Sequence, residues 1–162
     1  MAETLSVTDM LPNKFEPKRN YRWVLAIEGI DAFLVSSTNR PQIQIGEKKI
    51  EFINSYRMIA SKLSFQDLSV KLHDPIAPSG AQQVMEWIRT HYESVSGRAG
   101  YADFYKRDIQ LKMLDPIGTV VELWDIKGAF ISNANFQSLD YTGDEIMTID
   151  LTLKFDNCVL QF

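Results

Sequence analysis

The chain has 162 residues, 45% of them hydrophobic, and a formal net charge of -4. A chain of this size folds as one domain that removes about 70% of its unfolded surface from water, so it needs no disulfide or metal for stability. The acidic balance argues against a protein that grips nucleic acid, because phosphate neutralisation requires a concentrated basic surface. The single cysteine, Cys158, excludes an internal disulfide and indicates an intracellular assembly environment.

The first twenty residues carry no export or membrane signal. The start MAETLSVTDML lacks the basic residues and apolar core of a signal peptide. No apolar run approaches the roughly 20 residues that a bilayer requires. Residues 1–20 are polar and contain Pro12 and Pro17, so we expect an N-terminal arm followed by a single domain over 21–162.

The first predicted element is a β-hairpin. Residues 21–28 form an apolar strand, residues 29–31 a turn and residues 32–36 the return strand. Asn39-Arg40-Pro41 then ends the hairpin. The basic cluster of Lys18, Arg19 and Arg22 lies at the start of the first strand and is typical of a solvated strand entry.

Residues 42–65 favour a second, protruding hairpin or long loop. Isoleucine and phenylalanine alternate with polar residues around a polar tip, Gly46-Glu47-Lys48, and the pattern continues through Asn54-Ser55-Tyr56-Arg57. One interpretation is an ordinary edge hairpin, and another is an arm that reaches a partner. Apolar residues on a projecting element would otherwise stay exposed, a hazard that proteins manage by covering or pairing such edges.

One helix is predicted, over residues 80–93. It follows an alternating strand, residues 63–72, that ends at Asp74-Pro75. Ser79 is the expected N-cap, with Gln82 three residues later as in a capping box. Apolar residues then recur at helical spacing and would dock on the sheet; they are Val84, Trp87, Ile88 and Tyr92.

The clearest strand in the chain is the last one. Residues 108–114 and 120–126 are strand-like, and from residue 145 the chain alternates with one dry face. The predicted core residues of this last strand are Met147, Ile149, Leu151, Leu153 and Phe155. About seven or eight strands and one helix result, which predicts a mainly β fold, a two-sheet β-sandwich or curled barrel with the helix on its flank.

Motifs that carry catalysis or cofactor binding are missing from the sequence. No phosphate-binding glycine loop, dinucleotide fingerprint, zinc-protease motif or serine-hydrolase elbow occurs. His73 and His91 lack the spaced partners of a metal site, and the turn from Asp140 to Glu145 lacks the ligand pattern of a calcium loop. Cys158 has no base nearby in sequence. We therefore expect a protein that is not an enzyme and has no catalytic, cofactor or metal site.

Five short motifs resemble tail tube proteins of contractile-tailed bacteriophages, which are related to the inner tubes of contractile injection systems. The resemblance covers about residues 15–156. The motifs are Phe15-Glu16-Pro17, Asn20-Tyr21-Arg22-Trp23, Arg40-Pro41, Leu72-His73-Asp74-Pro75 and Leu139-Asp140-Tyr141. Their order, the chain length and the single helix agree with that family.

The resemblance implies a structural subunit whose inner strands join those of its neighbours into a hexameric ring barrel. Rings would stack into a hollow conduit inside a contractile sheath, for the ejection of phage DNA that passes without sequence-specific binding. The implied partners are other copies of the chain and the sheath, baseplate and tail terminator proteins. The implied location is the virion tail, assembled in the host bacterial cytoplasm.

Stacking of the rings would fall to an arm over about residues 42–57. Its residues are Ile43, Ile45, Glu47, Lys48, Lys49, Ile50 and Phe52. Ring closure would use the sheet edges, because a head-to-tail interface gives a ring when the rotation closes.

Two alternatives stay open. One is the inner tube of a phage-like or type VI-like injection system, whose cargo is protein. The other is a small β-barrel module that binds a ligand in a concave aromatic site, with Trp23, Trp124 and Tyr141 as candidate residues.

Overall fold

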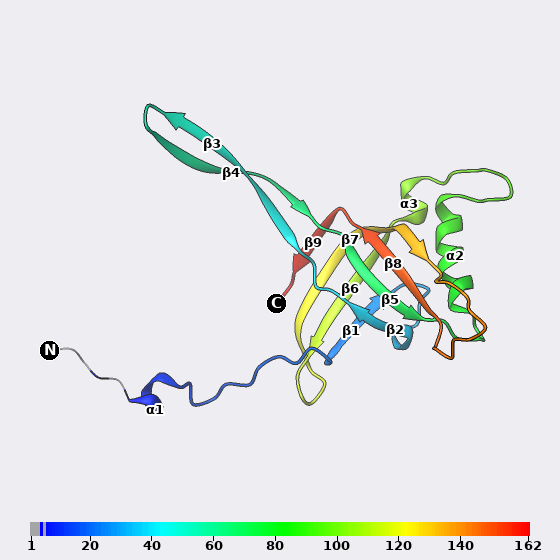
Figure 1. The fold of residues 1–162 in the computed structure, drawn as a ribbon, viewed down its shortest axis with the longest axis horizontal. Coiled ribbons are helices and arrows are strands. Elements are labelled where there is room, and N and C mark those ends of the chain that lie inside the picture. Colours follow the sequence, from blue (N-terminus) through cyan, green and yellow to red (C-terminus); the bar gives the residue numbers. More distant parts are fainter. Residues whose placement is uncertain (1–3, 5) are drawn as a thin grey trace.

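Seven strands form one continuous antiparallel sheet that folds over on itself (Figure 1). One layer contains β1 (Trp23–Ile27), β6 (Arg107–Leu114), the first half of β7 (Val120–Asn135) and β9 (Asn157–Leu160). The other contains the second half of β7, β8 (Thr148–Lys154), β5 (Leu68–His73) and β2 (Val35–Thr38). This computed structural model describes residue 4 and residues 6–162.

The predicted mainly β, two-layer fold is confirmed, although neither sheet of the described chain closes on itself. The second sheet is a two-stranded hairpin, β3 (Ile43–Phe52) and β4 (Ser55–Phe65), that projects away from the sandwich. Besides the predicted long helix, α2 (Gly80–His91), the chain forms two single-turn helices, α1 (Val7–Met10) and α3 (Ala102–Tyr105). Within the described range, no helix has the length and apolar character needed to span a membrane.

Strand β7 joins the two layers because it bends at Gly128. Up to Lys127 β7 pairs with β6 and β9, and from Phe130 on it pairs with β8, while a single Arg107–Ala129 pair with β6 lies just past the bend. Gly128 has a φ of 68°, in the left-handed region that favours glycine. A side chain at this position would also collide with the carboxylate of Asp156. The backbone conformation therefore favours glycine at the corner of the sandwich, and a larger residue would also have to displace the exposed Asp156 side chain.

The core lies between the two layers and under α2, as one cluster of buried side chains. Strand residues alternate between this core and the outside, as a pleated strand requires. In the last strand Ile149, Leu151 and Leu153 are at most 2% exposed. Phe155 is half-buried against the core, whereas Met147 is 36% exposed because β8 begins only at Thr148.

Helix α2 packs its buried Val84 and Trp87 into this core. Ser79 is the N-cap residue, but its side chain makes no capping hydrogen bond, so the expected capping box is absent. Instead, the Asp74 carboxylate accepts hydrogen bonds from the backbone N–H groups of Gly80, at 3.0 Å, and Ala81, at 3.3 Å. A carboxylate at a helix N-terminus also favours the helix dipole.

Replacing Asp74 with alanine is expected to lower the free energy of unfolding by about 1 to 2 kcal/mol, because two N–H groups of α2 lose their acceptor. Urea denaturation followed by tryptophan fluorescence measures this change. Asp31→Ala is the matched control, since Asp31 precedes the 3-10 helix Ala32–Leu34 without a side-chain capping bond. Equal stability of the two variants would contradict the capping role.

The predicted hairpin over residues 21–36 is wrong. Strands β1 and β2 do not pair with each other, because β1 pairs with β6 and β2 pairs with β5. The 3-10 helix Ala32–Leu34 carries the chain from one layer to the other. These two strands therefore lie at opposite ends of the strand order. The sequence interpretation missed this because local alternation does not distinguish a hairpin return from a crossing between layers.

Candidate assembly interface

The β3–β4 hairpin projects far from the sandwich (Figure 1). Its register runs from the Ile43–Phe65 pair at the base to the Phe52–Ser55 pair at the far end. The turn is therefore Ile53-Asn54, and the predicted tip at Gly46-Glu47-Lys48 is wrong because that segment continues β3. Ile53 has a φ of 51°, which is rare for a β-branched residue and marks a strained turn.

The hairpin has apolar side chains on both of its faces. Residues directly opposite each other in a pair share a face, and faces alternate along the strand. Phe52 and Ile50 lie on one face near the tip, whereas Tyr56 and Met58 lie on the other, opposite Glu51 and Lys49. Each of these four apolar side chains is between 45% and 73% exposed. Neither face of the hairpin is covered.

All seven residues of the predicted stacking arm lie on β3. Ile43, Ile45, Ile50 and Phe52 are exposed there, as the arm interpretation requires. The sequence interpretation omitted most of β4, whose exposed apolar residues are Tyr56, Met58, Ile59 and Leu63. The signal was present, because residues 56–63 carry at least as many apolar residues as 43–52. The expected arm nevertheless ended at residue 57, because the tip was placed at residues 46–48 and Leu63 was assigned to the next strand.

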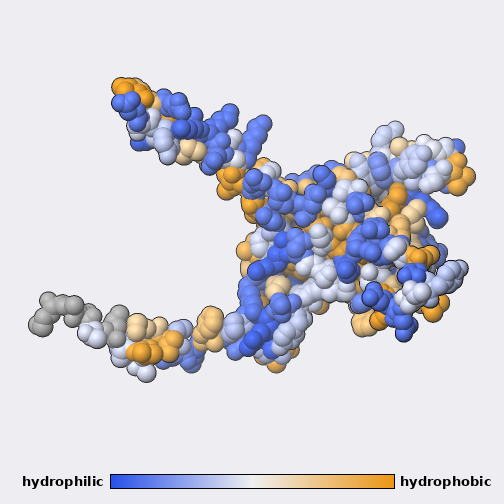
Figure 2. All heavy atoms as spheres, in the orientation of Figure 1, coloured by the Kyte–Doolittle hydropathy of each residue, from blue (hydrophilic) through white to orange (hydrophobic). Residues whose placement is uncertain are grey.

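Exposed apolar surface of this extent indicates an interface. Two-stranded hairpins are at best marginally stable in water, and soluble monomers rarely carry a large contiguous apolar patch. In Figure 2 the apolar residues gather at the tip and near the root of the hairpin. The hairpin is therefore the part of the fold best suited to be buried by another protein surface.

The N-terminal segment is a second projection and leaves the sandwich on the same side as the hairpin (Figures 1 and 2). It contains α1, whose first turn is closed by reciprocal hydrogen bonds between Ser6 and Asp9. Val7, Met10 and Phe15 are each more than half exposed. No residue of α1 reaches the core.

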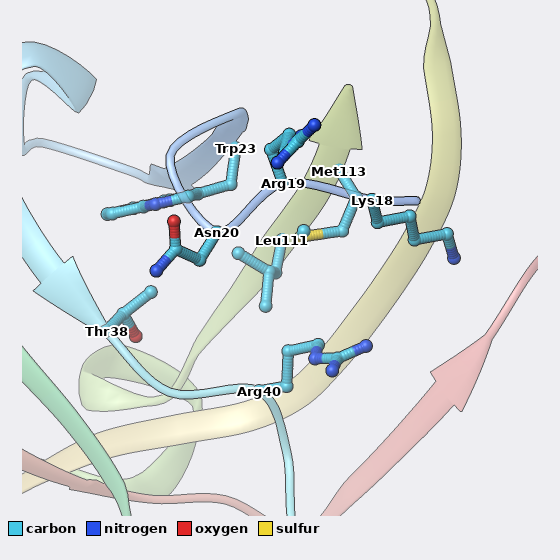
Figure 3. A pocket seen from close by; sticks show the side chains of 8 residues that line it. All are labelled: Lys18, Arg19, Asn20, Trp23, Thr38, Arg40, Leu111 and Met113. Carbon is cyan, nitrogen blue, oxygen red and sulfur yellow. The ribbon is translucent and has the colours of Figure 1, made fainter. Parts of the chain in front are cut away.

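The roots of both projections meet at one buried carboxylate, Glu122 on β7. This side chain is 7% exposed and forms an ion pair with Lys18 from the N-terminal segment. Its other oxygen lies 3.6 Å from Arg40, which directly precedes the hairpin, and accepts a hydrogen bond from the indole N–H of Trp124. Figure 3 shows Lys18 and Arg40 on opposite sides of the adjoining cleft. Glu122 thus ties both projections to the sandwich.

Burial alone would raise the pKa of Glu122, but the hydrogen bonds from Lys18 and Trp124 and the charges of Lys18 and Arg40 lower it below its usual 4.5. A carboxylate with a lowered folded-state pKa adds stability above its unfolded pKa, and this stability is lost as pH falls through the folded value.

Glu122→Gln is expected to lower the free energy of unfolding by about 1 to 2 kcal/mol at pH 7, because a charge-assisted hydrogen bond is lost. The loss is limited because Glu122 is buried but its partners Lys18 and Arg40 are exposed to solvent. As the pH falls through the lowered pKa of folded Glu122, the difference between the wild type and the variant should shrink, because Glu122 itself becomes protonated. Urea denaturation of both proteins from pH 3 to pH 7 measures this difference in the free energy of unfolding. A difference that stays constant over this range would contradict the ion-pair account.

Three sheet edges lack a partner strand over the described residues. Strands β1 and β2 are the first and last in the strand order, and β9 pairs only with β7. Unpaired edges are templates for pairing with another chain. That these edges join neighbouring subunits stays a prediction.

The other candidate sites are not assembled by the fold. The cleft in Figure 3 is lined by Trp23 but not by Trp124 or Tyr141, so it is not the aromatic site of a binding module. His91 stacks edge-on against Tyr105, with ring centroids 4.4 Å apart. Burial raises the pKa of the Cys158 thiol, which disfavours a reactive thiolate. Among the described residues no group of three or more metal-ligating side chains gathers.

Comparison with known proteins identifies the fold. No protein-family model and no curated protein matches the chain. A chain of the cryo-EM structure of the anti-feeding prophage cap, the tube terminating cap, matches with a TM-score of 0.76 and 18% identity over 97% of this chain and 99% of that one. A chain of the PVC sheath-tube complex, an extracellular contractile injection system in the extended state, matches with a TM-score of 0.68 and 16% identity, over 98% and 99%.

The chain has the tail tube fold. Hcp1 from Flavobacterium johnsoniae also matches, with a TM-score of 0.52 and 10% identity over 87% of this chain and 95% of that one. The resemblance expected from the sequence is therefore confirmed for the fold. Two of the motifs that carry the resemblance have structural roles here. In Leu72-His73-Asp74-Pro75, Asp74 caps α2, and in Arg40-Pro41, Arg40 approaches Glu122 at the root of the hairpin.

Proposed function

We propose that the protein is a structural tube subunit of a contractile tail or injection apparatus. Six subunits form a ring, and rings stack into a hollow conduit inside a contractile sheath. Its partners are other copies of the chain, the sheath, the baseplate and the terminator. The protein is not an enzyme, and its contribution is to supply surfaces that become buried on assembly.

The exposed β3–β4 hairpin carries this proposal. Its apolar residues are uncovered on both faces, so burying them would remove a large apolar area from water at roughly 25 cal/mol per Å². In the isolated subunit the hairpin adds little stability, because it contributes no buried side chain to the core. Between stacked rings it would form the main contact. The hairpin then acts as the stacking arm, extended from the predicted 42–57 to 43–65.

Ring closure is assigned to the free sheet edges. Strand addition between neighbours satisfies the backbone groups of these edges and removes an aggregation hazard. An interface between two different edges is head-to-tail, and it gives a closed ring when the rotation per subunit divides a full turn. The particle is assembled in a bacterial cytoplasm, as expected from the tail tube resemblance.

The cargo is DNA in a phage tail and protein in an injection system. The solved proteins with this fold include components of extracellular contractile injection systems, which favours the injection system. A chain with a net charge of -4 is suited to either cargo, because it would not hold DNA by phosphate neutralisation. Cargo co-purified with assembled particles, tested with nuclease and protease, distinguishes the two.

A terminating cap subunit is a second candidate, favoured by the match to the tube terminating cap of the anti-feeding prophage. A tube subunit must carry a donor surface and an acceptor surface for continued stacking. A cap subunit needs one of them, because it ends the tube. The two functions therefore differ in whether rings of this chain stack on each other.

Electron microscopy of the concentrated protein, with mass measurement in solution, tests the proposal. Hollow filaments or stacked sixfold rings are expected of a tube subunit. Single rings that do not stack on each other at any concentration would assign the protein to the cap. A monomer that neither forms rings nor joins tubes nucleated by a baseplate would overturn both functions.

A further inference from the structure

The loop between β7 and β8 is the largest exposed irregular segment at the end of the sandwich opposite the hairpin. The hairpin leaves the sheet beside the Leu68–Leu153 pair, where β5 begins. The loop over residues 136–147 instead adjoins the His73–Thr148 pair at the other end of the same strands. Figure 1 shows the loop in orange, across the sandwich from the hairpin. The two elements thus face opposite directions along the strands.

This loop carries uncovered apolar side chains around a hollow. Every residue from 137 to 147 is exposed. Leu139 is 84% exposed, Ile146 is 78% exposed and Tyr141 is fully exposed. The loop lines a shallow hollow of about 390 Å³ whose walls are mostly polar, with Leu139, Ile146 and Met147 as their large apolar members. Irregular loops of about this length are uncommon in compact domains.

Charge distinguishes the loop from the hairpin. The loop contains Asp140, Asp144 and Glu145 and no basic residue between positions 136 and 147. The hairpin has a net charge of +2, although the whole chain has a net charge of -4; its basic residues are Lys48, Lys49, Arg57 and Lys62. Complementary charges around apolar centres favour correct docking and register between two surfaces.

We infer that the loop over residues 136–147 is the docking site for the β3–β4 hairpin of a second copy of this chain in the adjoining ring. Rings that stack with the same polarity bring one end of each subunit against the opposite end of the next, so the contact joins two different surfaces. The hairpin supplies apolar residues and positive charge, and the loop supplies apolar residues and negative charge. This inference rests on the proposed tube function and names the partner surface of its stacking arm.

Site-specific photo-crosslinking in assembled tubes tests the docking site. The photoreactive residue p-benzoylphenylalanine in place of Tyr141 is expected to crosslink to residues 43–65 of another copy, identified by mass spectrometry of the linked peptides. The same residue in place of Tyr101, which is 81% exposed in the loop after α2, is the matched control and should not link to the hairpin. Crosslinks from position 141 to any other segment would overturn the docking site while the tube function stands.

Charge exchange provides a second test. Lys48→Glu with Lys49→Glu in the hairpin, or Asp144→Lys with Glu145→Lys in the loop, is expected to raise the protein concentration needed for stacking about tenfold. The protein that carries all four changes should recover near wild-type stacking, because each pair of charges is exchanged. Absence of recovery, with all variants still folded and forming rings, would contradict the pairing. If the wild type forms no stacked rings, the proposed tube function fails as well.

Discussion

Replacing Ile45 and Ile50 with aspartate is expected to abolish ring stacking while the sandwich stays folded. Both side chains belong to β3 and are 60% and 54% exposed, so they contribute little to the stability of the isolated chain. In the proposed assembly both enter a surface that excludes water, where an unpaired charge costs several kcal/mol. Repeated at every inter-ring contact, that cost exceeds what a stacking interface gains.

Negative-stain microscopy and sedimentation velocity measure the loss of stacking, and circular dichroism checks the fold. A matched double variant, Val95→Asp with Ile117→Asp, adds the same charges at exposed apolar positions outside the hairpin. That control should stack like the wild type. Filaments of normal length from the Ile45 and Ile50 variant would overturn the assignment of the hairpin as the stacking arm.

Leu151→Ala is expected to lower the free energy of unfolding by about 2 to 5 kcal/mol, because it opens a cavity between the two layers. Leu151 is 2% exposed on β8, paired with Val70 of β5 on one side and with Ala134 of β7 on the other. A loss of this size approaches half the stability of a typical domain. The effect should therefore be visible even in a simple thermal melt.

Thr152→Ala is the control for this prediction. Thr152 follows Leu151 on the same strand, and its side chain points away from the core. Its effect should stay within about 0.5 kcal/mol. Urea titrations of the wild type and both variants give the two free energies. If the leucine variant melts at the wild-type temperature, the facing of β8 inferred from its alternation is incorrect.

Local periodicity predicted the parts of the fold that local sequence decides. The alternation around Leu151 follows from one dry face, and the helical spacing of Val84 and Trp87 follows from packing one stripe on the sheet. Strand identity was therefore accessible without any structure. The exposure of Ile45 and Ile50 was not decided by local sequence, because their alternation fits an ordinary edge hairpin as well as a projecting arm. Only the resemblance to tail tube proteins favoured the arm.

Features that depend on distant residues were not accessible. The partners of β1 and β2 are set by the layers on which they pack, and no local signal distinguishes that crossing from a hairpin. The cap of α2 comes from Asp74, six residues before Gly80, because the turn between them folds back. The pairing of Glu122 with Lys18 and Arg40 joins three separate segments, so alternation could identify Glu122 only as an unusual inward charge.

The bend of β7 at Gly128 determines how the molecule opens. Because one strand belongs to both layers, neither layer can lose its hydrogen bonds without disturbing the other, and the sandwich should unfold in one cooperative step. The hairpin contributes no buried side chain to the core and packs on the sandwich only at its root, where Phe65 contacts Phe155, so the rest of it should open locally at far lower cost. Amide hydrogen exchange in the free protein would therefore be fast over 43–65 and slow around Ile126. On incorporation into a tube, the amides of residues 43–65 would exchange slowly as well.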